Sequence, residues 1–146
     1  MANHYRQFAV AVRLRGKLAA AWITEMLRDR QKAWQQLVDA EQHDAADAIG
    51  IDFDWMIDDG QLHLTDNGEH GNVEHVDQLL RELIRIGYVQ EPVAIHWADT
   101  CSRHRPGEFT GGAALVTKRR TYWFVLPELV EKKVAALERR RRASGS

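Results

Sequence analysis

The most regular hydrophobic pattern of the chain lies in residues 72–87, where apolar side chains recur at helical spacing. That spacing places them on one face of an α-helix. Asn72 has a side chain suited to cap the first turn, and Gly87 suits the residue that ends a helix. We therefore predict an amphipathic helix with its apolar face in the core. The apolar residues are Val73, Val76, Leu79, Leu80, Leu83 and Ile84.

Residues 51–64 follow a different pattern, because apolar and polar side chains alternate as they do along a half-buried strand. Asp58-Asp59-Gly60 interrupts the alternation with residue types of a tight turn, so the segment predicts a β-hairpin. Neighbouring side chains of a strand point to opposite faces, and Asp52 and Asp54 should therefore be exposed together. The residues expected in the core are Ile51, Phe53, Trp55 and Ile57.

The first fifty residues mainly favour helices. Apolar residues recur at helical spacing over residues 4–27, and a second helical pattern runs from Asp29 to about Ile49, just before Gly50. Together they predict a helical hairpin over residues 1–50. Residues 8–14 allow a second interpretation, because they also alternate as a strand that would end at Gly16.

The rest of the chain predicts further strands and a last helix. Apolar runs at residues 93–98, 113–117 and 121–126 predict three strands, and Pro127 suits the first turn of a helix over residues 128–141. The order of elements predicts an α+β fold, in which the helical hairpin precedes a mainly antiparallel sheet of about five strands with helices packed on one face. We expect a single domain over residues 1–142, divided at residue 50 into the hairpin and the sheet region, and a frayed tail at residues 143–146.

Composition narrows the class of protein. The 146 residues are 45% hydrophobic, and they contain neither a signal-peptide pattern nor an apolar run long enough to span a membrane. These features predict a soluble cytoplasmic protein without a membrane partner. The single cysteine, Cys101, excludes an intrachain disulfide and is consistent with a reducing compartment.

Charge is strongly segregated along the chain. Residues 39–77 hold twelve of the 21 acidic residues and no Lys or Arg, so the remainder holds all 20 bases against nine acids. A field so divided attracts partners of opposite charge. On a strand, Asp52 and Asp54 would lie roughly 6.5 to 7 Å apart and would imitate the phosphate spacing of a nucleic-acid strand. We predict an acidic face that engages a protein with a basic surface; its residues are Asp52, Asp54, Asp58, Asp59, Asp66 and Glu69.

Residues 63–75 also combine three histidines with three carboxylates, which raises the question of a metal. Zinc needs three or four converging ligands, and no H-E-x-x-H spacing places two of them on adjacent helical turns. Nor does Asp52-x-Asp54 continue into a calcium loop, because Trp55 and Ile57 occupy positions that need polar ligands. We predict no metal and no cofactor.

Residues 97–112 hold the densest collection of reactive and turn-forming side chains. In an enzyme, Cys101 would be the nucleophile, activated by His104 or by a more distant His such as His96, and Arg103 or Arg105 would hold an anion. The tyrosine-phosphatase pattern is absent, because Gly107 stands where that pattern requires Arg six positions after the cysteine. A small enzyme is therefore the alternative, and a non-enzymatic binding protein is the favoured interpretation.

The string WADTCSRHRPGEFTGGAALVT, residues 97–117, carries a resemblance. With the preceding helix and strand, it resembles a stretch in small uncharacterised proteins of bacteriophages and mobile elements, over about half of the chain. The resemblance implies a prokaryotic cytoplasm and an accessory or anti-defence role, but it supplies no catalytic residue. Its most concrete form is an inhibitor of a host nucleic-acid-handling system, similar in strategy to anti-CRISPR proteins.

The C-terminal end is strongly basic. Four consecutive arginines follow an amphipathic helical pattern, and such a run can contact phosphates. Cations at the end of a helix also favour its macrodipole without any partner. Nucleic-acid binding is therefore a further alternative, carried by Arg139, Arg140, Arg141 and Arg142.

Overall fold

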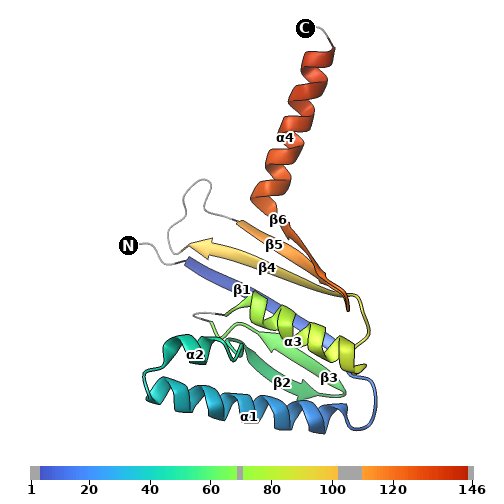
Figure 1. Ribbon diagram of the computed structural model, residues 1–146. Helices are drawn as coiled ribbons and strands as arrows, with labels where there is room; N and C mark the ends of the chain where they lie inside the picture. The colour runs from blue at the N-terminus through green and yellow to red at the C-terminus, as the bar shows by residue number, and fades with distance from the viewer. Residues whose placement is uncertain (1–3, 69–70, 102–109, 145–146) are drawn as a thin grey trace.

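The computed structural model describes residues 4–68, 71–101 and 110–144, which form an α+β fold with a six-stranded antiparallel sheet (Figure 1). The strand order across the sheet is β2-β3-β1-β4-β5-β6. The strands are β1 (His4–Arg13), β2 (Asp54–Asp58), β3 (Gln61–Thr65), β4 (Val93–Cys101), β5 (Thr110–Val116) and β6 (Thr121–Val125). The helices are α1 (Ala19–Asp39), α2 (His43–Asp47), α3 (Val73–Ile86) and α4 (Leu126–Ala143).

Helices α1 and α3 cover one face of the sheet (Figure 1). Phe8, Val10 and Val12 point from β1 towards these helices and are buried, whereas the intervening Ala9 and Ala11 are exposed on the opposite face. Each buried side chain of this size stabilises the fold by about 1.5–3 kcal/mol relative to an exposed one. The core therefore lies entirely between the two helices and one face of the sheet.

The predicted N-terminal helical hairpin is wrong. Residues 4–13 form β1, a central strand that pairs with both β3 and β4, and the alternation over residues 8–14 was the correct signal. Helix α1 then runs without a break through the junction between the two predicted helices. Only α2, five residues long, remains of the end of the second predicted helix. The additional strand also raises the number of strands from about five to six.

The predicted hairpin and amphipathic helix are both present. The turn between β2 and β3 has positive φ at Asp59 and Gly60, as a two-residue hairpin turn requires. Strand β2 begins only at Asp54, so Asp52 precedes the strand and the two carboxylates do not share one strand face. Asn72 caps α3 by accepting from the backbone N–H of Glu74 at 2.9 Å, and α3 ends at Gly87 with φ of 98°.

Helix α4 leaves the edge of the sheet after β6 and projects away from the rest of the domain (Figure 1). Pro127 lies in its first turn, as predicted, since a proline there loses no helical hydrogen bond. No residue of α4 is buried. Among the described helices, none is both long and apolar enough to cross a membrane.

Candidate functional site: an acidic cavity beside Trp34

A cavity of about 510 Å³ opens between the C-terminal half of α1, the short helix α2 and the segment that leads into β2. Its volume lies within the range of small-ligand and side-chain pockets. The lining combines apolar side chains with amides and carboxylates. It comprises Gln31, Trp34, Gln35, Val38, His43, Ala46, Asp47, Ile51, Asp52, Phe53, Asp54 and Asn67.

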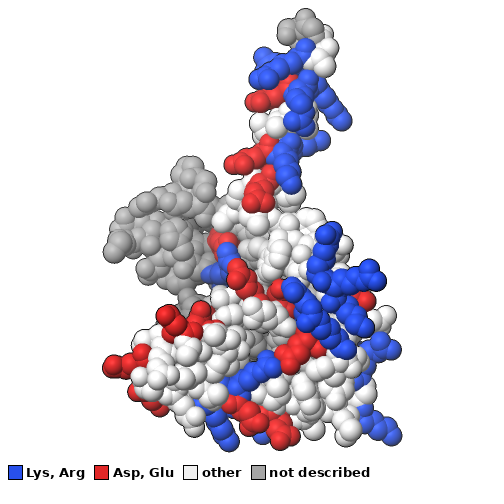
Figure 2. Space-filling view, viewed as in Figure 1, with Lys and Arg blue, Asp and Glu red and all other residues white. Residues whose placement is uncertain are grey.

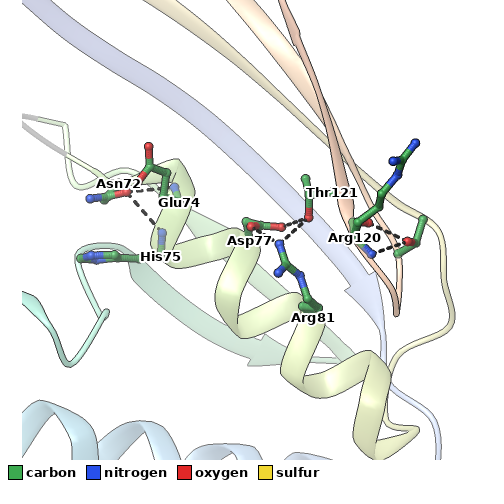
Figure 3. A network of polar contacts seen from close by, with 8 residues as sticks. Asn72, Glu74, His75, Asp77, Arg81, Arg120 and Thr121 are labelled. Carbon is green, nitrogen blue, oxygen red and sulfur yellow. Dashed lines mark hydrogen bonds and ion pairs between the residues drawn. The ribbon is translucent and has the colours of Figure 1, made fainter.

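The segment before β2 is held against the start of α3 by backbone hydrogen bonds. The N–H of Asp52 donates to Nδ1 of His75 at 3.0 Å, and the N–H of Asn72 donates to the carbonyl of Asp52 at 2.8 Å. Figure 3 shows His75 and Asn72 at this end of α3. His75 is buried, so the bond from Asp52 satisfies a ring nitrogen that would otherwise be unpaired. These bonds fix the position of Asp52 at the cavity.

The cavity has a strongly acidic wall. Asp47, Asp52 and Asp54 line it, and no Lys or Arg is found among the described lining residues. Phe53, between the last two, is buried and anchors this wall in the core. Carboxylates form their strongest hydrogen bonds with guanidinium and ammonium groups. The cavity therefore suits a cationic side chain.

Trp34 supplies an aromatic wall from α1. It is 38% exposed, and Gln31 and Gln35 from the same helix line the cavity beside it. A guanidinium or ammonium group over an indole ring gains roughly 0.5–2 kcal/mol, depending on how far it is desolvated. Trp34 and the carboxylates thus offer a cation two different kinds of contact within one cavity.

The structure divides the predicted acidic face. Asp52 and Asp54 line the cavity, whereas Asp58 and Asp59 lie at the turn that ends β2. Four residues of extended strand separate Asp54 from Asp58 by about 13 Å. The sixth predicted residue, Glu69, lies outside the described residues.

Asp66 has a local structural contact. Its carboxylate accepts from the backbone N–H of Phe8 at 2.9 Å and from that of Gly68 at 3.0 Å. The first bond connects the end of β3 to β1, and the second closes the turn that follows β3. Asp66 therefore stabilises this junction, and it does not line the cavity.

Only Asp52 and Asp54 of the cavity residues were among the sequence-based candidates, and Gln31, Trp34 and Asp47 are among those that were missed. Trp34 lies within the helical pattern that begins at Asp29, where an apolar residue is expected in the core rather than at a site. No spacing rule connects these residues with Asp52 or Asp54, since they lie on separate elements. The acidity of residues 39–77 was the only available signal, and it located Asp47 without singling it out.

The proposed catalytic alternative falls largely outside the described residues. Cys101 ends β4, whereas Arg103 and His104 belong to the undescribed segment 102–109. Nearby, Arg6 binds Asp99 through two hydrogen bonds, Nε to Oδ1 at 2.7 Å and Nη2 to Oδ2 at 3.0 Å. The hydrogen bond with Asp99 raises the pKa of Arg6, and desolvation opposes that rise. Asp99 on β4 thus forms an ion pair with Arg6 on the neighbouring strand β1.

The four C-terminal arginines occupy a different part of the molecule from the cavity. Figure 2 shows Lys and Arg side chains following α4 to its tip, while Asp and Glu gather near the end of the domain that carries α2. Arg139, Arg140, Arg141 and Arg142 are all exposed on the last turns of α4. These four arginines are therefore remote from the acidic residues near α2, although Lys and Arg also lie on the body of the domain and α4 itself carries Glu128, Glu131 and Glu138.

Within the described ranges, no three or more His, Cys, Asp or Glu side chains lie together as a metal site would require. His63 is in β3 and His75 is in α3, and His75 already accepts the backbone hydrogen bond from Asp52. Glu69 and His70 of the same predicted group lie outside these ranges.

Comparison with known proteins assigns no function to this chain. The chain matches no protein-family model, no curated protein and no solved structure. The class defined by the fold is an α+β domain built on a six-stranded antiparallel sheet.

Proposed function

We propose that this protein is a non-enzymatic binding protein, whose acidic cavity receives a Lys or Arg side chain from the basic surface of a partner protein. The observation that carries the proposal is the convergence of Trp34 with Asp47, Asp52 and Asp54 around one cavity. A planar guanidinium suits this arrangement best, because it stacks on an aromatic face and donates in parallel to carboxylates.

The expected energetics support a role for the cavity as the centre of an interface. Hydrogen bonds to charged groups contribute roughly 1.5–3 kcal/mol each. Trp and Arg are enriched among the few interface residues that carry most of the binding energy. The surrounding acidic surface adds long-range attraction, which raises the association rate at low salt. The cavity would provide affinity, and the wider acidic surface would provide the encounter rate.

The biological form that we propose is an inhibitor of a nucleic-acid-handling protein or complex of a prokaryotic cytoplasm. A basic groove that binds phosphates would also attract the acidic end of this domain, so the two ligands would compete. The resemblance of residues 97–117 to bacteriophage and mobile-element proteins supports an anti-defence role of this kind, similar in strategy to anti-CRISPR proteins.

The decisive experiment compares two charge reversals on the same strand. Partner proteins are captured from a prokaryotic lysate at low and high salt, and the retained partner is then titrated with Asp54→Lys and Asp58→Lys variants. Both residues are exposed on β2, but only Asp54 lines the cavity. We expect Asp54→Lys to weaken binding at least about tenfold, as expected for loss of a central contact, and Asp58→Lys to weaken it only about two- to threefold through the encounter rate.

Trp34→Ala gives an independent test of the aromatic wall. It removes the ring without changing any charge, so it should weaken binding at both low and high salt. Equal losses of affinity for Asp54→Lys and Asp58→Lys, with no effect of Trp34→Ala, would show that the partner binds a diffuse acidic surface and not the cavity. Unchanged binding in all three variants would contradict the proposed function.

A second candidate function is contact with nucleic acid through α4. The projection of this helix from the domain favours it, because Arg139 to Arg142 are exposed at its tip and can approach a phosphate backbone. Retention on DNA or RNA should then fall steeply with salt. Replacing the four arginines by Gln should abolish retention, whereas Asp54→Lys should not reduce it.

A further inference from the structure

Exposed apolar side chains are concentrated in β6 and α4. Tyr122, Trp123 and Phe124 are consecutive residues of one strand, and their exposed fractions are 40%, 42% and 43%. Neither face of β6 is therefore fully covered. Leu126 and Leu129 continue the same surface into the first turns of α4 and are exposed to a similar extent. We call these five residues the C-terminal apolar surface. Tyr122 and Phe124 lie on one face of β6, and Trp123 lies on the other, where its ring centroid is 5.9 Å from that of Trp97. Exposed apolar side chains on both faces of an edge strand mark an interaction site.

The two edges of the sheet differ in how they are protected. On the β2 edge, Asp54 and Asp58 are exposed and oppose pairing with another strand. On the β6 edge, residues 121–125 contain no charged residue and no proline. Natural edge strands are usually blocked by one of these devices. The β6 edge is therefore suited to accept a further strand.

The hydrogen-bonding groups of β6 are arranged for self-pairing. The N–H of Thr117 donates to the carbonyl of Arg120 at 3.0 Å, and Leu115 and Ala113 lie opposite Tyr122 and Phe124. Bonded and non-bonded pairs alternate along an antiparallel ladder. It follows that the backbone N–H and C=O groups of residues 122 and 124 form hydrogen bonds with β5. The same groups of residues 121, 123 and 125 point to the open edge. Trp123 is the middle of these three.

We propose that a second copy of this chain pairs with the β6 edge in antiparallel orientation, with Trp123 at the two-fold axis. Residue 123 would then bond to the partner's residue 123 in both directions, and the two sheets would become one continuous sheet. Such an interface is isologous, since the same surface serves both copies. Tyr122 would lie opposite the partner's Phe124, which forms a pair of aromatic contacts across the axis.

Charge favours this orientation. In the antiparallel pair, Val125 lies opposite the partner's Thr121, so the first turns of α4 come beside the partner's turn at residues 117–120. Glu128 and Glu131 lie in those turns of α4, and the opposing turn carries Lys118, Arg119 and Arg120. Acids of each copy would therefore meet bases of the other. The basic tips of the two α4 helices would point away from each other.

The size of the surface predicts the strength of the pair. With roughly 150–250 Å² for each full aromatic side chain, the exposed parts of the C-terminal apolar surface amount to roughly 400–500 Å² per copy. Two copies reach roughly 800–1,000 Å², within the range of weak or transient interfaces. An interface of this size is typical of weak or transient pairs, so we expect monomer and dimer to coexist in solution. The dimer uses the β6 edge and leaves the acidic cavity, at the other end of the sheet order, accessible in both copies.

Sedimentation of the full chain over a wide range of protein concentrations tests the proposal. We expect a concentration-dependent monomer–dimer equilibrium. Phe124→Lys should shift it at least about tenfold towards monomer, by placing like charges at the interface. The matched control is Met56→Lys, because Met56 is an exposed apolar residue on the opposite edge strand. It should leave the equilibrium unchanged.

A cysteine test checks the register without depending on dissociation. In a Cys101→Ser background, Trp123→Cys places two thiols at the two-fold axis, where Cα atoms of a bonded pair lie about 5.5 Å apart, within the range of a disulfide. Oxidation should give a covalent dimer, and Met56→Cys in the same background should not. A wild-type chain that stays monomeric at the highest concentration overturns the proposal, as does a dimer that Met56→Lys, and not Phe124→Lys, dissociates.

Discussion

The carboxylate of Asp77, at the start of the second turn of α3, accepts a hydrogen bond from the hydroxyl of Thr121, the first residue of β6 (Figure 3). Arg81 completes the group by donating to Oδ2 of Asp77 and to Oγ1 of Thr121, both at 2.8 Å. Asp77 is only 5% exposed, so this network ties α3 to the far edge of the sheet from inside the fold. The same edge carries the proposed self-pairing surface.

Removing the carboxylate of Asp77 should be strongly destabilising. Asp77→Ala leaves the Arg81 guanidinium with a partly buried charge and no acid partner, and breaking such a pair typically costs about 3–5 kcal/mol. Thr121→Val removes one neutral partner and should cost about 1–2 kcal/mol. Urea unfolding of both variants measures these changes in the free energy of unfolding. The exposed Glu74→Ala serves as a control, and a loss for Asp77→Ala no larger than this control would show that the network contributes little.

Gly112 should not tolerate a side chain. A Cβ at this position would lie 2.5 Å from the carbonyl oxygen of Phe124 and 2.5 Å from Cζ2 of Trp97. Gly112→Ala therefore forces the Trp97 ring or β6 to move, and such overpacking typically costs about 1–3 kcal/mol. Thermal unfolding measures the loss, with Ala94→Ser on the open face of the sheet as the control. A variant as stable as the wild type would mean that β6 is not held closely against β5.

The Arg6–Asp99 pair should contribute modestly to the free energy of unfolding. The contribution of Arg6 should not change with pH near neutrality. The two side chains are 42% and 25% exposed, so we expect Arg6→Gln to cost about 0.5–1 kcal/mol, as for partly solvated pairs. The pKa of Arg6 is raised in the folded state, so its stabilising effect is complete below the ordinary arginine pKa and is lost only as pH rises through the raised value. Denaturant unfolding at pH 7 and 9 should therefore give the same loss. A loss that disappears by pH 9 would contradict this assignment.

Cys101 should be dispensable for the proposed function. Cys101→Ser removes the thiol of the enzyme alternative but leaves the cavity unchanged, because Cys101 is not among its lining residues. Binding of the captured partner should keep its affinity and its salt dependence. A folded Cys101→Ser protein that loses all activity, while Asp54→Lys retains it, would favour the enzyme that uses Cys101, Arg103 and His104.

Local sequence patterns predicted the elements whose signals are complete within a short stretch. Helix α3 has its cap, its apolar stripe and its terminal glycine within residues 72–87, and the β2–β3 turn has residue types that favour positive φ. The start of α4 at Leu126, with Pro127 in its first turn, follows from the same kind of local rule. These signals remain valid in any tertiary setting, because they depend on the backbone geometry of a few consecutive residues.

The N-terminal region shows where local pattern is insufficient. Residues 4–13 satisfy both a helical and an alternating pattern, and short apolar runs allow either structure. Pairing with β3 and β4 on both sides decides the choice, because it satisfies the backbone groups of a central strand and buries Phe8, Val10 and Val12 together. Those partners lie 48 to 97 positions away along the chain.

By itself, the sequence determined the α+β class, the segregation of charge and the presence of Asp52 and Asp54 in an acidic region. Only the tertiary structure decided which acids share a cavity and that Trp34 forms its wall, because α1, α2 and the segment before β2 meet through long-range packing. It also left β6 at an unprotected edge, next to a helix with no buried residue. An edge is a property of the whole sheet, since a strand becomes one only when no further strand follows it in the strand order.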